Sequence, residues 1–398
     1  MKFSSRLKRG GLSVALLWAL TDCSSRGLRG SEPAVPLPPR LSDAEVARLI
    51  PSHVEDREGW AHDVLVALES QRVHPSVVPV CQVLAVIEQE SGYQANPAVK
   101  DLPRIVRKRL DGYAEKLGAV GRTALQALLK HRAPGQSLSF EARLKAVKTE
   151  RDLDRLFREL LKAYEEQYPA AYTAADLASE LISSQGLEEL NPITTAGSMQ
   201  VSVRYAQQQS DEDRPEAEVR EELYTRAGGV RYGTARLLGY EAGYNKPIYR
   251  FADYNAGFYA SRNAAFQLQV SQLTGLPLVL DGDLLLYDKE EKPRDEDSRT
   301  LTALLAFRKR HAPDLSERQL RRDVRKEKRA DFEQTETWRT VRQVYQRVKG
   351  TPPEYERLPE VAIQSPKLSQ DRTTAWFARS VNQRFERCMS RHTAPAAK

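Results

Sequence analysis

Helical periodicity runs through most of this chain, and it limits the fold more than any other feature of the sequence. Apolar residues recur about every three to four positions in segment after segment, which predicts a mainly α-helical protein. One stretch differs: "LPLVLDGDLLLYD", Leu276 to Asp288, has two apolar runs around Asp281-Gly282 and predicts a β-hairpin near residues 276–287. The predicted helices cover residues 42–50, 57–72, 77–91, 121–132, 139–149, 151–167, 174–185, 198–208, 216–225, 229–241, 250–272, 298–311, 316–330, 333–349 and 371–389.

The N-terminus resembles that of an exported, lipid-anchored protein. A positively charged start and the apolar run "GLSVALLWAL", Gly11 to Leu20, predict a signal peptide over residues 1–22, because the run is too short to span a membrane. "LTDC" resembles a bacterial lipobox that would place a lipid on Cys23, although Asp22 departs from the small residue usual there. The residue after the cysteine is Ser24 and not aspartate, which resembles the sequence of lipoproteins sorted to the outer membrane. We therefore expect an outer-membrane lipoprotein of the cell envelope that faces the periplasm; the alternative is a secreted protein in which Cys23 has no role.

Composition separates a tether from the folded part of the chain. Residues 23–40 have the Pro, Gly and Ser content of a flexible tether, and the folded part is expected to open with a capping box at Ser42 and Glu45. The formal charge of +7 falls to +4 once the four basic residues and one acid of the signal peptide are removed. This bias is mild and no nucleic-acid-binding motif accompanies it, so nucleic acid is not expected as a partner.

The cysteines and histidines predict no metal site. Besides Cys23, the chain contains Cys81 and Cys388, which could pair in an oxidising envelope. Because Cys81 lies in an apolar helical stretch, the favoured prediction is a packed thiol. The 6 histidines show no ligand spacing with cysteines or carboxylates, and no metal or other cofactor is expected.

One carboxylate continues an apolar helical stripe. Val80, Val83, Ile87 and Glu90 fall on one face of a predicted helix. A carboxyl group on such a face loses hydration when it ionises, so its pKa should rise and it could donate a proton near neutral pH. The alternative is that Glu90 ends the helix and faces solvent or a salt-bridge partner. Glu88 lies off this line and is the weaker candidate.

Three short motifs follow one another in the order of a known enzyme core. "ESGY" begins at Glu90, "TAGSMQV" spans Thr195 to Val201, and "YNAG" spans Tyr254 to Gly257, after the Gly-containing helix "GGVRYGTARLL" from Gly228 to Leu238. Together they resemble the lytic transglycosylase core of the lysozyme superfamily. That family carries a Glu-Ser pair at a helix end, a Gly-x-Met-Gln-Ile/Val turn and an Ala-x-Tyr-Asn-Ala-Gly segment.

The resemblance implies a domain organisation. It covers residues 77–100 and 187–272, and more loosely the whole chain resembles Gram-negative envelope lipoproteins that carry the same core. The expected parts are a lysozyme-like domain over residues 41–290, with a helical insertion at 101–186, and a basic helical region over 291–398.

The chain departs from the family pattern in three ways. Glu90 and Gly197 are 107 positions apart, whereas the family joins these motifs by a short loop, so residues 101–186 could cap, reshape or block the cleft. Ser198 replaces an apolar residue that is common in the family. The hairpin and the C-terminal helices have no counterpart in the minimal core.

The C-terminal region contains a strongly basic segment. Between Arg308 and Arg329 there are ten Lys or Arg residues against four acids. These residues could contact anionic envelope polymers or lipid headgroups; a solvated helix face is the favoured prediction.

The resemblance implies a mechanism with one carboxylate, acting on peptidoglycan glycan strands. Glu90 would protonate the glycosidic oxygen between N-acetylmuramic acid and N-acetylglucosamine, then take the proton of the muramyl C6 hydroxyl as a 1,6-anhydro ring closes. No second carboxylate has to position water, in contrast to paired-carboxylate glycosidases. Ser91 would orient Glu90 or the substrate acetamido group. Gln200, with Met199 behind it, would line the sugar cleft.

Aromatic residues supply the other expected substrate contacts. By the same resemblance, Tyr254 and Asn255 would lie opposite Glu90. Six of the chain's 16 tyrosines lie between residues 232 and 259. Sugar stacking with a hydroxyl available for hydrogen bonding suits Tyr254 and Tyr232, whereas core packing is expected for the others.

The leading expectation is a membrane-anchored peptidoglycan lytic transglycosylase. One alternative is a catalytically silent lipoprotein that uses the fold to bind glycan, peptide or a partner protein. Another is hydrolysis in the manner of goose-type lysozymes, which would need a carboxylate to activate water, and the sequence identifies none. The expected partners are glycan strands and, through the lipid anchor, a membrane; the sequence points to no particular protein partner.

Overall fold

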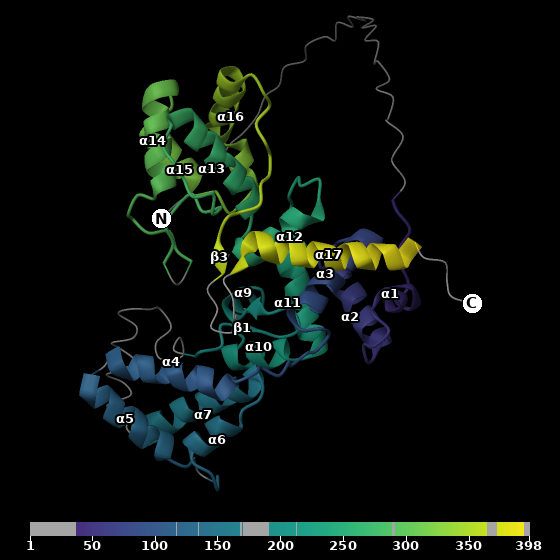
Figure 1. Cartoon of the computed structure of the whole chain (residues 1–398), viewed down its shortest axis with the longest axis vertical. Helices are drawn as coiled ribbons and strands as arrows, with labels where there is room; N and C mark the ends of the chain where they lie inside the picture. The colour runs from purple at the N-terminus through teal and green to yellow at the C-terminus, as the bar shows by residue number, and fades with distance from the viewer. Residues whose placement is uncertain are drawn as a thin grey trace, which may run out of the picture. The chain divides into compact units, whose positions relative to one another are not determined.

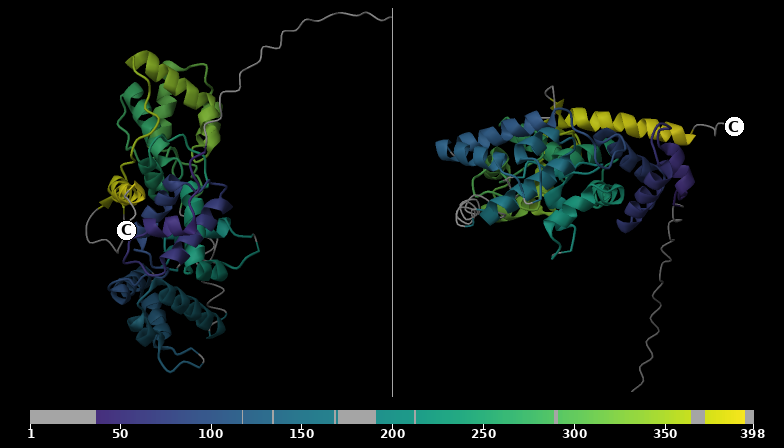
Figure 2. Two further views of the ribbon diagram at one scale, coloured as in Figure 1. Left: turned by 90° about the vertical axis from the view of Figure 1, so that its right-hand side faces the viewer. Right: turned by 90° about the horizontal axis from the view of Figure 1, so that it is seen from below.

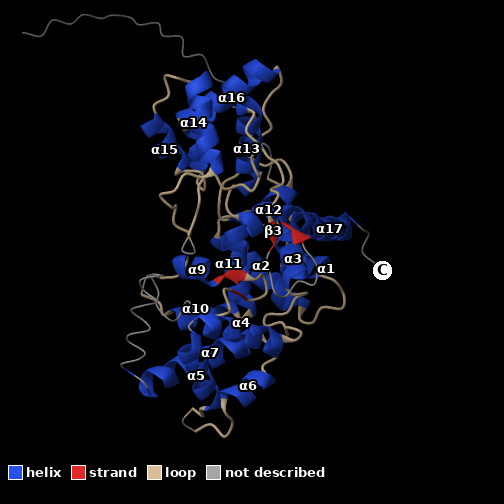
Figure 3. Cartoon of the chain, turned by 60° about the vertical axis from the view of Figure 1, so that its left-hand side comes forward, coloured by secondary structure: helices blue, strands red, loops and turns tan. Residues whose placement is uncertain are grey.

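The computed structural model describes residues 37–116, 118–133, 135–167, 169, 191–211, 213–288, 291–363 and 372–393. The predicted signal peptide, Cys23, most of the tether and the predicted helix over residues 174–185 lie outside this set. Contacts divide the chain into residues 1–38 and residues 39–398. Figure 3 shows that helices dominate the described residues, and the prediction of a mainly helical protein is confirmed.

Most predicted helices are present with shifted ends. The helices are α1 (Asp43–Leu49), α2 (Arg57–Ser70), α3 (Val77–Glu90), α4 (Leu102–Lys116), α5 (Gly118–Lys130), α6 (Phe140–Ala146), α7 (Glu150–Gln167), α9 (Val203–Gln208), α10 (Glu216–Leu223), α11 (Arg226–Leu238), α12 (Pro247–Ala256), α13 (Ala260–Thr274), α14 (Arg299–His311), α15 (Glu317–Val324), the 3-10 helix η2 (Ala330–Gln334), α16 (Glu336–Lys349) and α17 (Thr374–Thr393). Strands β1 (Thr195–Ala196) and β2 (Val201–Ser202) form one antiparallel pair, and β3 (Ala362–Ile363) and β4 (Arg372–Thr373) form another.

One hydrophobic core joins the beginning of the folded part to its end. Apolar side chains of α1, α2, α3, α11, α12 and α17 share this core, and Figures 1 and 2 draw α17 (yellow) beside the early helices (purple to blue). Val80, Val83 and Ile87 of α3 are fully buried, so the predicted stripe is confirmed. The predicted capping box is also present, because Ser42 and Glu45 accept hydrogen bonds from each other's backbone N–H groups at the start of α1.

A disulfide between Cys81 and Cys388 fastens α3 to α17. The two Cα atoms lie 5.6 Å apart, although 307 positions separate the residues in the sequence. The prediction that Cys81 is a packed thiol is therefore wrong. Its apolar surroundings were identified correctly, since both cysteines are buried. Helical periodicity could not show that the partner arrives on the last helix.

The insertion has a hydrophobic core of its own. Helices α4 to α7 contribute most of the apolar side chains of this cluster, with Leu102, Phe140 and Leu156 among them. Helix α4 was missed in the sequence, where Pro103 argues against a helix. Proline is tolerated in the first helical turn, whose N–H groups have no intrahelical partner. Leu102 and Val106 then face the core one turn apart.

Another core lies among α13, α14, α15 and α16. Phe266 of α13 stacks on Trp338 of α16, with ring centroids 5.2 Å apart, and packs edge-on against Phe332. The domain boundary expected at residue 290 falls inside this cluster, because α13 supplies part of it. The helix expected over residues 250–272 is broken into α12 and α13 at Gly257, whose φ of 124° is open only to glycine.

The hairpin predicted near residues 276–287 is wrong. The segment holds only an isolated bridge at Tyr287, and its backbone groups bond to side chains from elsewhere. Gly282 donates its N–H to Gln267 Oε1 at 2.9 Å, and Leu285 donates its N–H to Glu327 Oε1 at 3.0 Å. These two side chains take the place of a facing strand. A pattern of neighbouring residues cannot reveal such partners.

The buried carboxyl of Glu327 makes this region sensitive to pH. Burial raises its pKa to about 8, from an ordinary value of 4.5, although hydrogen bonds from Tyr287 and Leu284 act in the opposite direction. The folded state therefore holds a proton that the unfolded state releases above pH 4.5. We expect the free energy of unfolding of the wild type, relative to a Glu327→Gln variant, to fall as the pH rises from about 4.5 to about 8. Urea unfolding across that range measures the difference, and parallel curves for the two proteins would contradict it.

Neither a membrane span nor a metal cluster is found in the part of the chain that the structure describes. No helix there combines the length and the apolar composition needed to cross a membrane. No group of three or more His, Cys, Asp or Glu side chains there is placed to hold a metal ion.

Candidate functional site

Glu90 is the last residue of α3, a helix that packs against α17. Its side chain is half-buried. Desolvation raises the pKa of the Tyr254 hydroxyl on α12 well above its ordinary value, and the charge of Glu90 adds to this rise. Desolvation lowers the pKa of Arg384 on α17, whereas the charges of Glu88 and Glu90 oppose that change. The charge of Glu90, at the end of α3, therefore acts on side chains of both α12 and α17.

Glu88 has a different role, because it binds arginines of α17. Its carboxylate lies 3.8 Å from Arg384, 3.0 Å from Arg387 and 3.8 Å from Arg391. Next to it, Gln89 accepts a hydrogen bond from Ser380 of the same helix at 2.8 Å. These contacts hold α17 against α3 beside Glu90.

Ser91 shapes the turn that follows Glu90. Its hydroxyl donates to the carbonyl of Ile87 at 3.1 Å and accepts from the N–H of Gln94 at 3.2 Å. Gly92 and Tyr93 then adopt left-handed backbone conformations, with φ of 58° and 64°. Both of these hydrogen bonds are local: they join Ser91 to the end of α3 and to the turn that follows it.

The second motif is a small β-hairpin. Strands β1 and β2 pair Thr195 with Ser202 and Ala196 with Val201, and α9 begins only at residue 203, so the helix expected from residue 198 is shorter than predicted. Gly197 turns the chain with φ of 80°, and a Cβ there would collide with the carbonyl of Leu223. The turn is therefore packed closely against the C-terminal end of α10.

Met199 joins this hairpin to α11 and α12. Its side chain is fully buried against Gly233, where an added Cβ would overlap it. Its backbone carbonyl accepts a hydrogen bond from the hydroxyl of Tyr254 at 2.7 Å. This hydrogen bond joins the second and third sequence motifs, and the charge of Glu90, in the first motif, acts on the same tyrosine.

Replacing Tyr254 with phenylalanine should weaken that junction. The variant removes the hydrogen bond to the Met199 carbonyl, and we expect a loss of about 1–2 kcal/mol in the free energy of unfolding. Tyr345→Phe is the matched control, since its hydroxyl donates to Gln272 on the exposed surface. Chemical unfolding of both variants measures the effect, and equal small losses would argue against a structural junction at Tyr254.

The side chains of Gln200 and Asn255 are held by elements that the sequence motifs did not include. Gln200 Nε2 donates to Glu150 Oε2 at 3.1 Å, and Glu150 is the first residue of α7 in the insertion. Asn255 is exposed, and its Oδ1 accepts from the hydroxyl of Thr374 on α17 at 2.8 Å. Sequence reasoning missed both partners. The Thr149-x-x-Asp152 spacing, which signals a helix start, could have placed Glu150 at the beginning of α7.

Tyr232 lies in the hydrophobic core. It is 2% exposed, its hydroxyl hydrogen-bonds to Glu222 at 3.3 Å, and the guanidinium of Arg231 lies 4.4 Å from its ring centroid. A buried ring covered in this way offers no face to a saccharide. The structure therefore supports the packing alternative for Tyr232.

Asp253 explains much of the tyrosine cluster. This fully buried carboxylate accepts hydrogen bonds from the hydroxyls of Tyr240 and Tyr244, at 3.0 and 2.7 Å, and from the N–H of Ser261 at 2.7 Å. Burial raises its pKa. The sequence assigned no role to Asp253, yet it ties the end of α12 to the start of α13 across Gly257.

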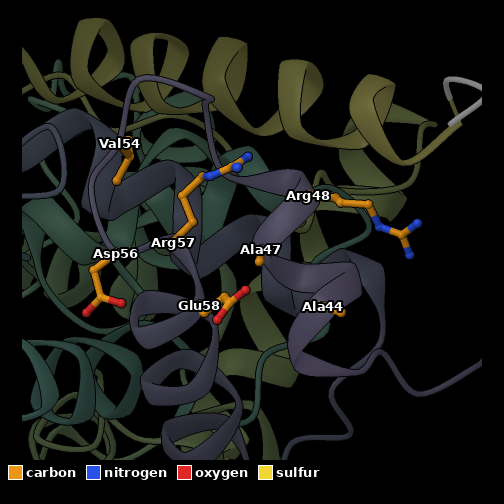
Figure 4. Close-up of a pocket in the computed structure, with 7 residues that line it drawn as sticks. All are labelled: Ala44, Ala47, Arg48, Val54, Asp56, Arg57 and Glu58. Carbon is orange, nitrogen blue, oxygen red and sulfur yellow. The ribbon is translucent and has the colours of Figure 1, made fainter. Parts of the chain in front are cut away.

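Two open cavities lie outside the motif residues. One, of about 570 Å³, lies at α1 and the start of α2. In Figure 4 the guanidinium groups of Arg48 and Arg57 point away from the carboxylates of Asp56 and Glu58. The other, of about 630 Å³, is lined by Tyr249, residues 354–358, Glu360 and two residues of α17, together with Asn245.

The chain belongs to the family described as "Protein of unknown function (DUF1615)", whose model matches residues 53–391. That match spans the motifs, the insertion and most of α17. The chain is also 37% identical over 384 residues to "Uncharacterized protein YaiW" of Escherichia coli strain K12, which covers 95% of this chain and 97% of that protein. No solved structure matches the chain.

Proposed function

We propose that this protein is a membrane-anchored peptidoglycan lytic transglycosylase with a lysozyme-like core. The observation that carries the proposal is the hydrogen bond from Tyr254 to the carbonyl of Met199, because the charge of Glu90 acts on the same Tyr254 hydroxyl. This bond and this charge link three segments that lie far apart in the chain, in the combination that the family resemblance requires.

Glu90 acts first as acid and then as base. It gives its proton to the glycosidic oxygen as the bond from that oxygen to C1 of N-acetylmuramic acid breaks. It then takes the proton of the muramyl C6 hydroxyl, whose oxygen forms the new bond to C1. Glu90 ends in its starting protonation state, and no water is consumed. The internal hydroxyl reacts at high effective concentration, so a single carboxylate suffices.

The disulfide and the N-terminus support a place in the cell envelope. Disulfides form and persist in oxidising compartments, such as the bacterial periplasm. The Cys81–Cys388 bond suits such a compartment. The lipobox-like sequence at Cys23 would add a lipid anchor, and the outer membrane, on its periplasmic side, is the proposed location.

The direct test uses protein that starts at Ser24 and lacks the lipid-modified cysteine. Incubation with purified sacculi should release muropeptides with 1,6-anhydro ends, which mass spectrometry distinguishes from reducing ends. Reducing ends would replace the proposal by hydrolysis. No released product would remove the enzymatic proposal altogether.

A silent binding protein is the second candidate. It is favoured by Gln200 and Asn255, whose carboxamides both bond to other parts of the chain. Such a protein would sediment with sacculi as strongly as an active enzyme does. Sedimentation without any released product, in wild type and Glu90→Gln alike, would support this candidate.

A further inference from the structure

A three-residue stretch of the insertion, Lys148 to Glu150, bonds both to the loop that follows the first sequence motif and to the second motif. It stands immediately before and at the start of α7. On one side it meets the loop that follows Glu90. On the other it meets the hairpin that carries Gln200. The insertion is therefore continuous with the proposed site.

The first set of contacts holds the loop after Glu90. Val99 donates its N–H to the carbonyl of Lys148 at 2.9 Å, and Asn96 Nδ2 donates to Thr149 Oγ1 at 3.2 Å. Ala98 and Thr149 form an isolated antiparallel bridge. The exit of the first motif is thus paired with the insertion by backbone as well as side-chain bonds.

The second contact orients a side chain of the second motif. Glu150 is 1% exposed, and its Oε2 lies 3.1 Å from Gln200 Nε2, while Gln200 Oε1 accepts from the hydroxyl of Thr195 at 3.1 Å. A carboxylate only accepts hydrogen bonds, so it requires the amide nitrogen of Gln200 to face it. The carboxamide oxygen then stays on the side of Thr195. Gln200 also has a left-handed backbone, with φ of 50°, which a non-glycine residue adopts only when its surroundings hold it there.

Helix α7 is itself firmly held, so Glu150 cannot drift. Arg151, Arg155 and Arg158 all bind the carboxylate of Glu221 on α10, with the shortest contacts at 2.9, 2.7 and 2.7 Å. Those arginines lower the pKa of Glu221 to about 2. On the neighbouring face, buried Asp154 accepts from Arg220 at 3.1 Å. Clustered and partly buried ion pairs of this kind fix the approach of one helix to another better than isolated surface pairs.

We propose that Glu150 is a positioning residue of the site, and that the insertion belongs to the substrate-binding machinery through it. The claim rests on the proposed transglycosylase function. Glu150 sets which end of the Gln200 carboxamide meets the glycan. Glu150 is 1% exposed and its carboxylate accepts a hydrogen bond from Gln200, so we assign it no role as the water-activating base that goose-type hydrolysis would need.

Three variants test this role. Glu150→Ala removes the acceptor, and Glu150→Gln keeps a possible hydrogen bond but no longer dictates the orientation of Gln200. Glu159→Ala is the matched control, because it removes another carboxylate of α7, one that pairs with Arg143 of α6 and takes no part in binding α7 to Glu221. The readouts are kcat and KM for anhydro product release, the thermal unfolding midpoint, and hydrogen–deuterium exchange of residues 195–202.

The expected result is a graded loss of activity. Glu150→Ala should lower kcat/KM by about 100-fold, as small displacements of a positioning group do, and Glu150→Gln should fall between it and the wild type. Exchange in the hairpin should quicken in Glu150→Ala and stay unchanged in Glu159→Ala. Equal losses in Glu150→Ala and Glu159→Ala, with an active wild type, would overturn the role of Glu150 alone. A wild type that releases no product would overturn the proposed function and this role with it.

Discussion

Replacing Glu90 with glutamine is expected to reduce the release of 1,6-anhydro muropeptides from sacculi by about 100-fold or more. Glutamine is similar in shape and can still form hydrogen bonds, but it can neither donate the proton that the leaving oxygen needs nor accept the one from the C6 hydroxyl. General acid–base catalysis by one group accounts for a factor of that order. Because Glu90 is only half-buried at the end of α3, the fold should tolerate the change.

The control for this experiment is Glu69→Gln. Glu69 lies in the last turn of α2, is exposed and pairs with Arg40, so it matches Glu90 in its place near a helix end but lies outside the motifs. Product yield should be unchanged in the control, and the thermal unfolding midpoints of both variants should stay near that of the wild type. Full product release by Glu90→Gln would rule out Glu90 as the catalytic acid.

Removing the disulfide is expected to lower the free energy of unfolding by about 3–5 kcal/mol. The bond closes a loop of more than 300 residues, and the loss of chain entropy in the unfolded state grows with loop length. A Cys81→Ala/Cys388→Ala double variant is the better choice, because serine would bury two hydroxyl groups in place of the sulfurs. Denaturant unfolding at equilibrium measures the difference.

The same shift should follow reduction of the wild type. A strong reductant should move the unfolding midpoint of the wild type to that of the double variant, and it should leave the double variant itself unchanged. If reductant leaves the wild-type midpoint in place, Cys81 and Cys388 do not pair in the folded protein.

Local pattern was sufficient for most of the helices that the structure describes, although it missed α4 and joined α12 to α13. The stripe through Val80, Val83 and Ile87 is buried as its spacing predicts, and the capping box at Ser42 opens α1. The motifs named Met199 and Tyr254, which a hydrogen bond joins in the structure, and Glu90, whose charge acts on Tyr254. Such features depend on neighbours within a few residues, and the sequence displays those neighbours directly.

The features that were missed depend on partners far away in the chain. The apolar runs around Gly282 suggested a hairpin, yet Gln267 and Glu327 take the backbone N–H groups that a facing strand would have used. Glu150 was invisible for the same reason, since its contact with Gln200 spans 50 positions. Periodicity reports which face of an element is apolar, and it does not report which distant polar group will meet that face.

The pairing of α17 with α3 also sets the order in which the protein can be completed. The first helices leave the ribosome long before the last one has been translated. Until then, the apolar surface that α17 covers in the folded protein stays uncovered. The covalent closure of this core is consequently a post-translational event. A chain shortened by its final two dozen residues would retain every motif residue. It would still lack α17, the helix that packs against α3 and is joined to it by the disulfide.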